Sequence, residues 1–236
     1  MSSPPRAASV TGEAAMKAPG QTRVAVMIDG SYFNRISNFY KFEHPVGRRV
    51  SLSGLLEFIR IAAADMEDVS RHRCRVVESH YFRGRYTLRD LEDRARSANF
   101  VEESLRNDRV FDQILAASNI TPHFTRIDTN SEPPKEQGID VWLALEAFDL
   151  AVSDRCDVVA LVAGDGDFVP LVKKINAIGK RALVAGWSMK SDQGAEVRYS
   201  GPLAGAAAYF LDMADLIDNP DDDEQRALVD QLFVDN

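Results

Sequence analysis

Residues 157–168 read DVVALVAGDGDF, and this stretch decides the fold. Its uninterrupted apolar run predicts a strand that is buried on both faces, as in a parallel sheet. The glycines and aspartates that follow it are turn-forming residues and end the strand. A second run, Arg23–Ile28, is likewise followed by Asp29 and Gly30. Two buried strands that end in the same way predict one sheet with acidic residues at a shared edge.

Further along the chain, apolar strand runs alternate with helical spacing. Strands are expected at Arg75–Phe82, Ile120–Ile127 and Arg181–Trp187. Helices are expected at Leu52–Met66, with Ser51 or Ser53 as its cap, and at Leu88–Ala117, Ile139–Val152 and Phe168–Ile178. This alternation is typical of an α/β domain whose parallel sheet has helices on both faces. We expect one such domain over residues 22–218.

The two ends of the chain differ in composition from this domain. Residues 1–21 are rich in Ala, Pro, Ser and Gly and lack the apolar segment of a secretory signal. They predict a flexible N-terminal arm. Residues 219–236 begin with Asn-Pro and a run of four acids, and residues 225–233 are amphipathic. They predict an acidic tail with a short terminal helix.

Composition excludes several classes of protein. The apolar fraction is 45% and the charged fraction 27%, as in ordinary globular chains. Apolar runs fall far short of the ~20 residues that span a bilayer, so no membrane association is expected. Two cysteines are too few for a disulfide scaffold or a zinc site, which favours the reducing cytoplasm. The net charge of -8 argues against indiscriminate nucleic-acid binding, although a local basic strip can still bind phosphates.

Carboxylates follow several of the predicted strands. Asp29 ends the first strand, Asp165 and Asp167 end the strand at 157–163, Asp140 opens a helix, and Glu146 lies six residues on. Ligands of open α/β sheets bind at the carboxyl edge of the strands. Converging carboxylates repel each other unless a cation lies between them, and oxygen ligands favour Mg²⁺ or Mn²⁺ over Zn²⁺. Each Asp-Gly pair alone is an ordinary turn or helix cap. The combination is what favours a metal site suited to phosphate esters.

These residues resemble the NYN domain family, a LabA-like branch of the PIN-like nuclease superfamily. The resemblance covers most of residues 23–218. It is carried by the blocks at 24–30 (VAVMIDG), 135–145 (KEQGIDVWLAL), 161–172 (LVAGDGDFVPLV), 179–180 (GK) and 214–218 (ADLID).

The resemblance implies a PIN-like three-layer α/β/α sandwich with a central, mainly parallel sheet. It also implies a divalent-metal-dependent endoribonuclease, in which a water activated by the metal attacks the phosphodiester in line. By position, the catalytic carboxylates and ligands of Mg²⁺ or Mn²⁺ would be Asp29, Asp140, Asp165 and Asp167, with Glu146 as a further ligand where relatives often have Asp.

The resemblance also bears on the groups that bind substrate. Lys135 lies in the loop before the helix and would meet a phosphate. Relatives usually carry Asn within two residues of the Asp-Gly pair. Here Ser31 or the later Asn34 would take that place, and the sequence leaves this choice open.

An arginine-rich strip predicts where nucleic acid binds. Eight arginines lie between residues 71 and 96, with Tyr81, Phe82 and Tyr86 among them. Guanidinium groups pair with phosphates, and aromatic rings stack with unpaired bases. We expect Arg83 and Arg85 to contact the phosphates of single-stranded or structured RNA. Arg89, Arg94 and Arg96 would equally pair with the acids at 90, 92 and 93 on a solvated helix.

Two other functions remain compatible with the sequence. One is a catalytically weak module that binds RNA or a protein partner as a regulator. The other is a metal-dependent phosphatase of small esters, against which the spread of arginines and aromatics over a long strip argues. Homodimerisation through exposed arms or terminal helices is compatible with the chain, which offers no direct sign of it. The RNA species and the pathway are not specified by the sequence.

Overall fold

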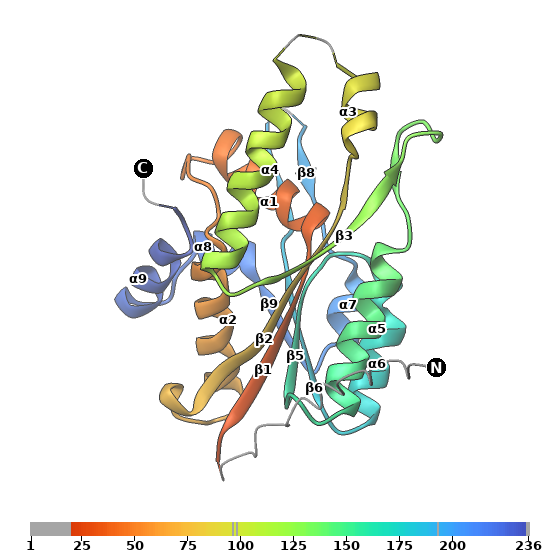
Figure 1. The fold of residues 1–236 in the computed structure, drawn as a ribbon. Coiled ribbons are helices and arrows are strands. Elements are labelled where there is room, and N and C mark those ends of the chain that lie inside the picture. Colours follow the sequence, from red (N-terminus) through yellow and green to blue (C-terminus); the bar gives the residue numbers. More distant parts are fainter. Residues whose placement is uncertain (1–19, 96, 98, 193, 235–236) are drawn as a thin grey trace, which may run out of the picture.

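The computed structural model describes residues 20–95, 97, 99–192 and 194–234. Within them a seven-stranded sheet runs in the order β4-β3-β2-β1-β5-β6-β9 (Figure 1). All neighbouring strands are parallel except β3 and β4. The strands are β1 (Thr22–Asp29), β2 (Cys74–Arg85), β3 (Thr121–Asp128), β4 (Lys135–Glu136), β5 (Val158–Val162), β6 (Arg181–Gly186) and β9 (Tyr209–Asp212), with β7 (Met189–Lys190) and β8 (Glu196–Val197) as a separate antiparallel pair.

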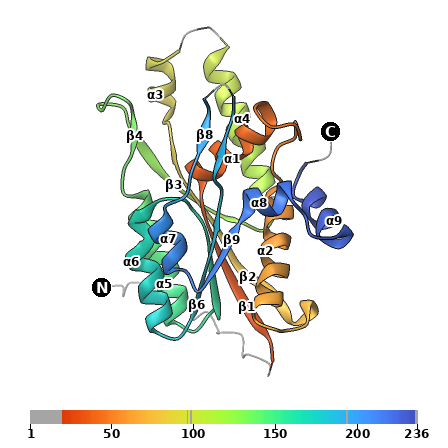
Figure 2. The same cartoon turned by 180° about the vertical axis from the view of Figure 1, so that it is seen from behind.

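Helices cover both faces of the sheet (Figures 1 and 2). One face carries α1 (Gly30–Phe42), α2 (Leu52–Met66), α4 (Phe100–Ala117) and α8 (Met213–Asp218), and the other α5 (Ile139–Val152), α6 (Val169–Ala177) and α7 (Gly201–Ala206). Alternate residues of β1 enter the two cores: Val24 and Val26 face α1 and α2, whereas Ala25 and Met27 face α5 and α6. The predicted three-layer α/β/α fold is confirmed. No helix in the described part of the chain is long and apolar enough to cross a bilayer.

The long periodic elements lie close to their predicted positions, and the short ones were missed. Helix α2 has the predicted bounds, and the Ser51 hydroxyl accepts from the Gly54 N–H at 3.1 Å. The segment 88–117, for which one or two helices are expected, forms two, α3 (Leu88–Asp93) and α4. Helix α1 follows β1 directly and was not predicted. Strands β4 and β7–β9 contain two to four residues, too few to show a period.

The segment expected to be an acidic tail packs onto the domain. Helix α9 (Asp223–Gln231) is capped by Asp222, and Leu232 and Phe233 after it are buried. The Ser51 N–H donates to the Leu232 carbonyl at 2.7 Å. Acidic residues thus form only the start of this segment, and its apolar end completes the core beside α2. Of the expected N-terminal arm, residues 1–19 lie outside the described residues.

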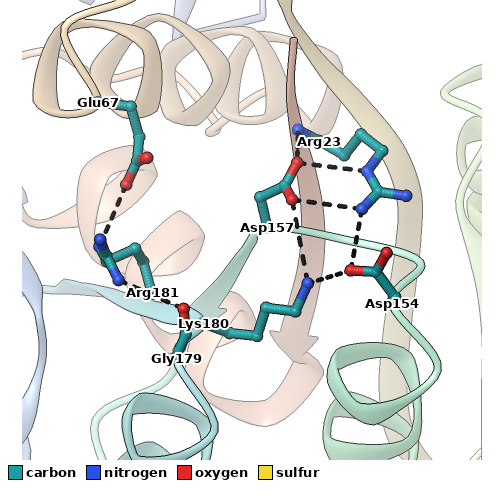
Figure 3. Close-up of polar contacts among 7 residues, drawn as sticks. All are labelled: Arg23, Glu67, Asp154, Asp157, Gly179, Lys180 and Arg181. Carbon is teal, nitrogen blue, oxygen red and sulfur yellow. Dashed lines mark hydrogen bonds and ion pairs between the residues drawn. The ribbon is translucent and has the colours of Figure 1, made fainter. Parts of the chain in front are cut away.

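Ion pairs join β1, β5 and β6 where these strands begin (Figure 3). Asp157 Oδ2 accepts from the backbone N–H of Arg23 at 2.9 Å and from its Nε at 3.3 Å. Arg23 Nη2 also donates to Asp154 at 3.3 Å, and Lys180 Nζ lies 4.0 Å from Asp157 and contacts Asp154. The Arg23 side chain is 9% exposed, so Asp157 compensates a charge that is almost removed from water.

Removing the charge of Asp157 should therefore destabilise the fold. We expect Asp157→Asn to lower the free energy of unfolding by about 3–5 kcal/mol, because it leaves a buried cation poorly compensated. Asp154→Asn is the matched control, since the Asp154 side chain is 74% exposed and its loss should leave stability close to that of the parent. Urea unfolding followed by circular dichroism measures both. Equal losses in the two variants would contradict a special role for Asp157.

Candidate functional site

Asp29 lies where β1 passes into α1, at the carboxyl edge of the sheet. Its Oδ1 accepts from the backbone N–H groups of Ser31 at 2.9 Å and Tyr32 at 3.0 Å, which caps the helix. Gly30 is required after it, since a Cβ there would lie 2.7 Å from the Phe82 carbonyl oxygen and 2.6 Å from the Tyr81 ring. The Asp-Gly pair therefore serves the turn and holds one carboxylate oxygen in a fixed position.

Glu136 is a member of the site that the sequence did not single out. It lies on the two-residue strand β4, and its Oε1 accepts from Ser31 Oγ at 2.8 Å and from the Gly84 N–H at 2.9 Å. Its position between Lys135 and Asp140 in the resemblance block was the available signal. A two-residue strand has no periodicity from which it can be predicted. The position of Glu136 near Asp29 therefore becomes evident only from the pairing of β4 with β3.

The other three predicted aspartates come from the start of α5 and from the end of β5. Asp140 is in the first turn of α5, which begins after Gly138 in a left-handed conformation at φ 71°. Asp165 follows β5, and its Oδ1 accepts from the Asp167 N–H at 2.9 Å, so it caps a short 3₁₀ turn (Gly166–Phe168). All three side chains are exposed. They are open to solvent, whereas Asp29 lies deeper.

Repulsion between carboxylates contributes to the raised pKa values of Asp29 and Asp140. We call the group to which they belong the acidic cluster; it consists of Asp29, Glu136, Asp140, Asp165 and Asp167. Burial, with contributions from Asp140 and Glu136, raises the pKa of Asp29 to about 6. The pKa of Asp140 is also raised, by burial first and then by the charges of Asp165, Glu136 and Asp167. Carboxylates that raise one another's pKa lack a compensating positive charge.

The acidic cluster fits a hard divalent cation by the chemistry of its donors. All five side chains offer carboxylate oxygens, which suit Mg²⁺ or Mn²⁺. Burial is the first cause of the raised pKa of Asp29, and a cation would offset the repulsion by Asp140 and Glu136 that adds to it. As they stand, no three His, Cys, Asp or Glu side chains among the described residues are grouped tightly enough to hold one ion together.

Glu146 is not brought to this cluster. Its charge acts on His80 and His123, which stack on the α5 side of β2 and β3. A separation of six residues turns the helix by about 240°, so Glu146 cannot share the direction of Asp140. The expectation that Glu146 joins the metal ligands therefore differs from the structure.

The predicted substrate-binding residues fall into two groups: those near the acidic cluster, and Arg85, which is paired with carboxylates of α4. Ser31 and Asn34 lie on the first turns of α1, and Ser31 is bonded to Glu136. With its amide oxygen facing the guanidinium, Asn34 accepts from Arg83 Nη1 at 2.7 Å and Nη2 at 2.9 Å. Lys135 is exposed on β4 next to Glu136. These groups surround the acidic cluster.

Arg85 is engaged differently from Arg83. Its Nη1 and Nη2 donate to Asp112 at 3.2 and 2.7 Å, and its Nε lies 3.5 Å from Asp108. Two carboxylates from α4 therefore balance its charge. This pairing competes with the phosphate contact expected from the sequence.

Tyr32 takes a core position immediately after the Asp-Gly turn. Its hydroxyl accepts from the Trp187 N–H at 2.8 Å and donates to the Trp187 carbonyl at 3.1 Å. Its ring packs on Gly164, where a Cβ would approach it to 2.5 Å. Tyr32 thereby links the ends of β1, β5 and β6, which hold the cluster in place.

Comparison with known proteins supports one family. The sequence profile of the NYN domain matches residues 23–214. An uncharacterised protein from Methanocaldococcus jannaschii is 31% identical over 86 residues, which are 36% of this chain and 32% of that protein. The chain thus matches about a third of the length of this curated relative.

A solved structure supports the fold. The crystal structure of a protein of unknown function from Vibrio parahaemolyticus superposes with a TM-score of 0.52 at 17% identity. The match covers 85% of this chain and 98% of the other. At this identity it bears on the fold alone.

The raised pKa of Asp29 gives a pH test without added metal. The folded protein holds this proton to about pH 6, whereas the unfolded chain releases it near 3.8, so stability falls as the pH rises between these values. In chelator, Asp29→Asn should therefore be more stable than the parent at pH 8, by up to about 3 kcal/mol, and no more stable at pH 4. Asn keeps the helix cap.

Urea unfolding at a series of pH values measures this difference. Asp192→Asn, at an exposed loop position, is the control and should follow the parent at every pH. An Asp29→Asn curve parallel to that of the parent would mean that Asp29 is not held protonated by its surroundings.

Proposed function

This chain belongs to the NYN domain family of PIN-like nucleases, and from that premise we propose that it is a divalent-metal-dependent endoribonuclease. The observation that carries the proposal is the acidic cluster, in which the pKa of Asp29 is raised to about 6 beside Asp140 and Glu136. A protein gains no stability from carboxylates that repel each other, so their convergence favours a function that uses their combined charge.

A divalent cation, when bound, would supply positive charge that lowers the pKa of an attacking water and stabilises the departing oxygen. Asp29, Asp140 and Asp165 are the residues proposed to hold it, with Asp167 beside Asp165. Asp29 is fixed by two backbone N–H groups, so it keeps its orientation as the substrate arrives. Glu136 is fixed by Ser31 and Gly84 and is available to orient an attacking water.

RNA is favoured over a small phosphate ester by the groups beside the cluster. Arg83 on β2 contacts Asn34 of α1, the helix that Asp29 caps, and the exposed Lys135 precedes Glu136 on β4. Both cations are proposed to bind phosphates of the RNA beside the scissile one. Arg83 is half-exposed, and the groups bonded to it, the Asn34 amide and the Tyr81 hydroxyl, are neutral, so its charge remains available. A single small ester would use only one of these cations.

Loss of one central carboxylate should stop the reaction. We expect Asp165→Asn to lower cleavage of a single-stranded RNA in Mg²⁺ or Mn²⁺ by at least about two orders of magnitude, while folding and RNA binding stay nearly intact. Gel analysis of an end-labelled oligomer measures cleavage, with EDTA as the metal-free arm. Asp192→Asn is the matched control and should cleave like the parent. Undiminished cleavage by Asp165→Asn would remove this carboxylate from the site.

Cation binding is testable without catalysis. We expect Mn²⁺ to raise the midpoint of thermal unfolding of the parent, because an ion that binds only the folded state stabilises it. The rise should be much smaller in Asp140→Asn and unchanged in Asp192→Asn. Equal shifts in all three proteins would place the ion elsewhere.

A regulatory module that binds RNA without cutting it is the second candidate. It is favoured by the absence, among the described residues, of any three side chains already grouped to hold an ion. RNA binding by a folded protein that neither binds Mn²⁺ nor cleaves would select this reading. Hydrolysis of a small phosphate ester, with no cleavage of RNA, would select a phosphatase instead.

A further inference from the structure

Strands β2 and β3 end near α3 and α4 (Figure 1). Residues of these four elements line a cleft, which also includes Gly84, the residue bonded to Glu136 of the acidic cluster. Its volume is about 410 Å³, within the range of sites that take small organic ligands. Its walls combine rings, such as Phe124, with the guanidinium groups of Arg83 and Arg85, the Asp108 carboxylate and the neutral polar groups of Ser104 and Asn107.

Arg85 forms a flat platform in this cleft. Its N–H edges are taken by Asp112 and Asp108, and its guanidinium carbon lies 3.7 Å from the centroid of the Phe124 ring. With the edges bonded and one face on Phe124, the part that Arg85 can present to the cleft is its other face. Guanidinium planes of this kind stack on unpaired RNA bases.

The α4 side of the cleft offers polar groups of a different kind. Ser104 and Asn107 are three residues apart and therefore lie on the same side of the helix. The Asn107 amide has both donor and acceptor groups, as the edge of a nucleobase does. These neutral groups suit an uncharged planar ligand better than a phosphate.

The cleft is within reach of RNA bound at the carboxylates. Asp29 pairs in register with Phe82 on the neighbouring strand, and strands lie about 4.8 Å apart. Gly84, which is bonded to Glu136, directly precedes Arg85. A chain whose phosphate lies at the acidic cluster and on Arg83 therefore continues toward the cleft.

We propose that this cleft binds one unstacked base of single-stranded RNA beside the scissile phosphate. Arg85 and Phe124 form the stacking platform, and Ser104 and Asn107 contact the base edge. The proposal rests on the proposed function for its polymer substrate. It changes the expected role of Arg85 from phosphate ligand to base platform.

The test measures RNA binding in EDTA, so that cleavage does not enter. A fluorescent single-stranded oligomer is compared by anisotropy with versions that lack one base, scanned along its length. Because one stacked base contributes substantially to affinity, we expect loss of the base at one position to weaken binding roughly five- to a hundredfold, and loss elsewhere to have less effect.

Two variants connect that effect to the cleft. Arg85→Lys keeps the charge but removes the plane, so it should weaken binding of the intact oligomer and abolish the position effect. Asn107→Ala changes an exposed helix residue and should alter the preference among the four bases at that position. Arg106→Ala, on the same helix outside the cleft lining, is the control and should bind like the parent.

The outcomes separate this proposal from the nuclease itself. A position effect that is lost in Arg85→Lys supports the cleft even where the protein cuts nothing. Metal-dependent cleavage without any position effect overturns the cleft and leaves the nuclease. A position effect unchanged in both Arg85→Lys and Asn107→Ala, or no binding of RNA by the parent, also overturns it.

Discussion

Repulsion among carboxylates at one edge of a sheet is the constraint around which the remaining structure is arranged. Asp29, Glu136 and Asp140 come from three separate segments, and their charges disfavour one another. The fold keeps them together by using backbone donors rather than cations: N–H groups of Ser31 and Tyr32 hold Asp29, and that of Gly84 holds Glu136. Cationic side chains beside these carboxylates would have neutralised the negative charge that is proposed to attract a divalent cation.

At the opposite edge of the sheet, where β1, β5 and β6 begin, side chains of opposite charge are paired. There Arg23 and Lys180 surround Asp157, and opposite charges hold the beginnings of β1, β5 and β6 together. Between the two edges, the strands carry only apolar side chains such as Val26 and Leu161. Ion pairs lie at one edge and the acidic cluster at the other, so substitutions at the two edges can act independently. The contact of Trp187 with Tyr32 belongs to the carboxyl edge, where it joins the ends of β1 and β6.

Periodicity and apolar runs predicted most of the long elements, although the 13-residue helix α1 was not predicted. Helix α2 and strands β1 and β5 were predicted because 3.6- and 2-residue patterns and continuous apolar runs leave a clear trace. Strand β4 has two residues, and Glu136 was therefore missed although it bonds to Ser31. For Glu146, a family pattern gives a residue type but not the direction in which a helix turns it. The structure places its charge near His80, and its role as a metal ligand stays a prediction. The pairing of Arg85 with Asp112 depends on α4, whose orientation no local pattern contains.

The strand order has a consequence for synthesis of the chain. The central strand β1 is made early, yet it pairs on one side with β5, where Val24 meets Val158. Contacts so distant in sequence form late, since the intervening chain must first exist. During translation, Asp165 is therefore added long after Asp29, and Phe233, which is buried in the core, is added later still. The carboxyl edge that holds Asp29 is therefore completed only after most of the domain has been synthesised.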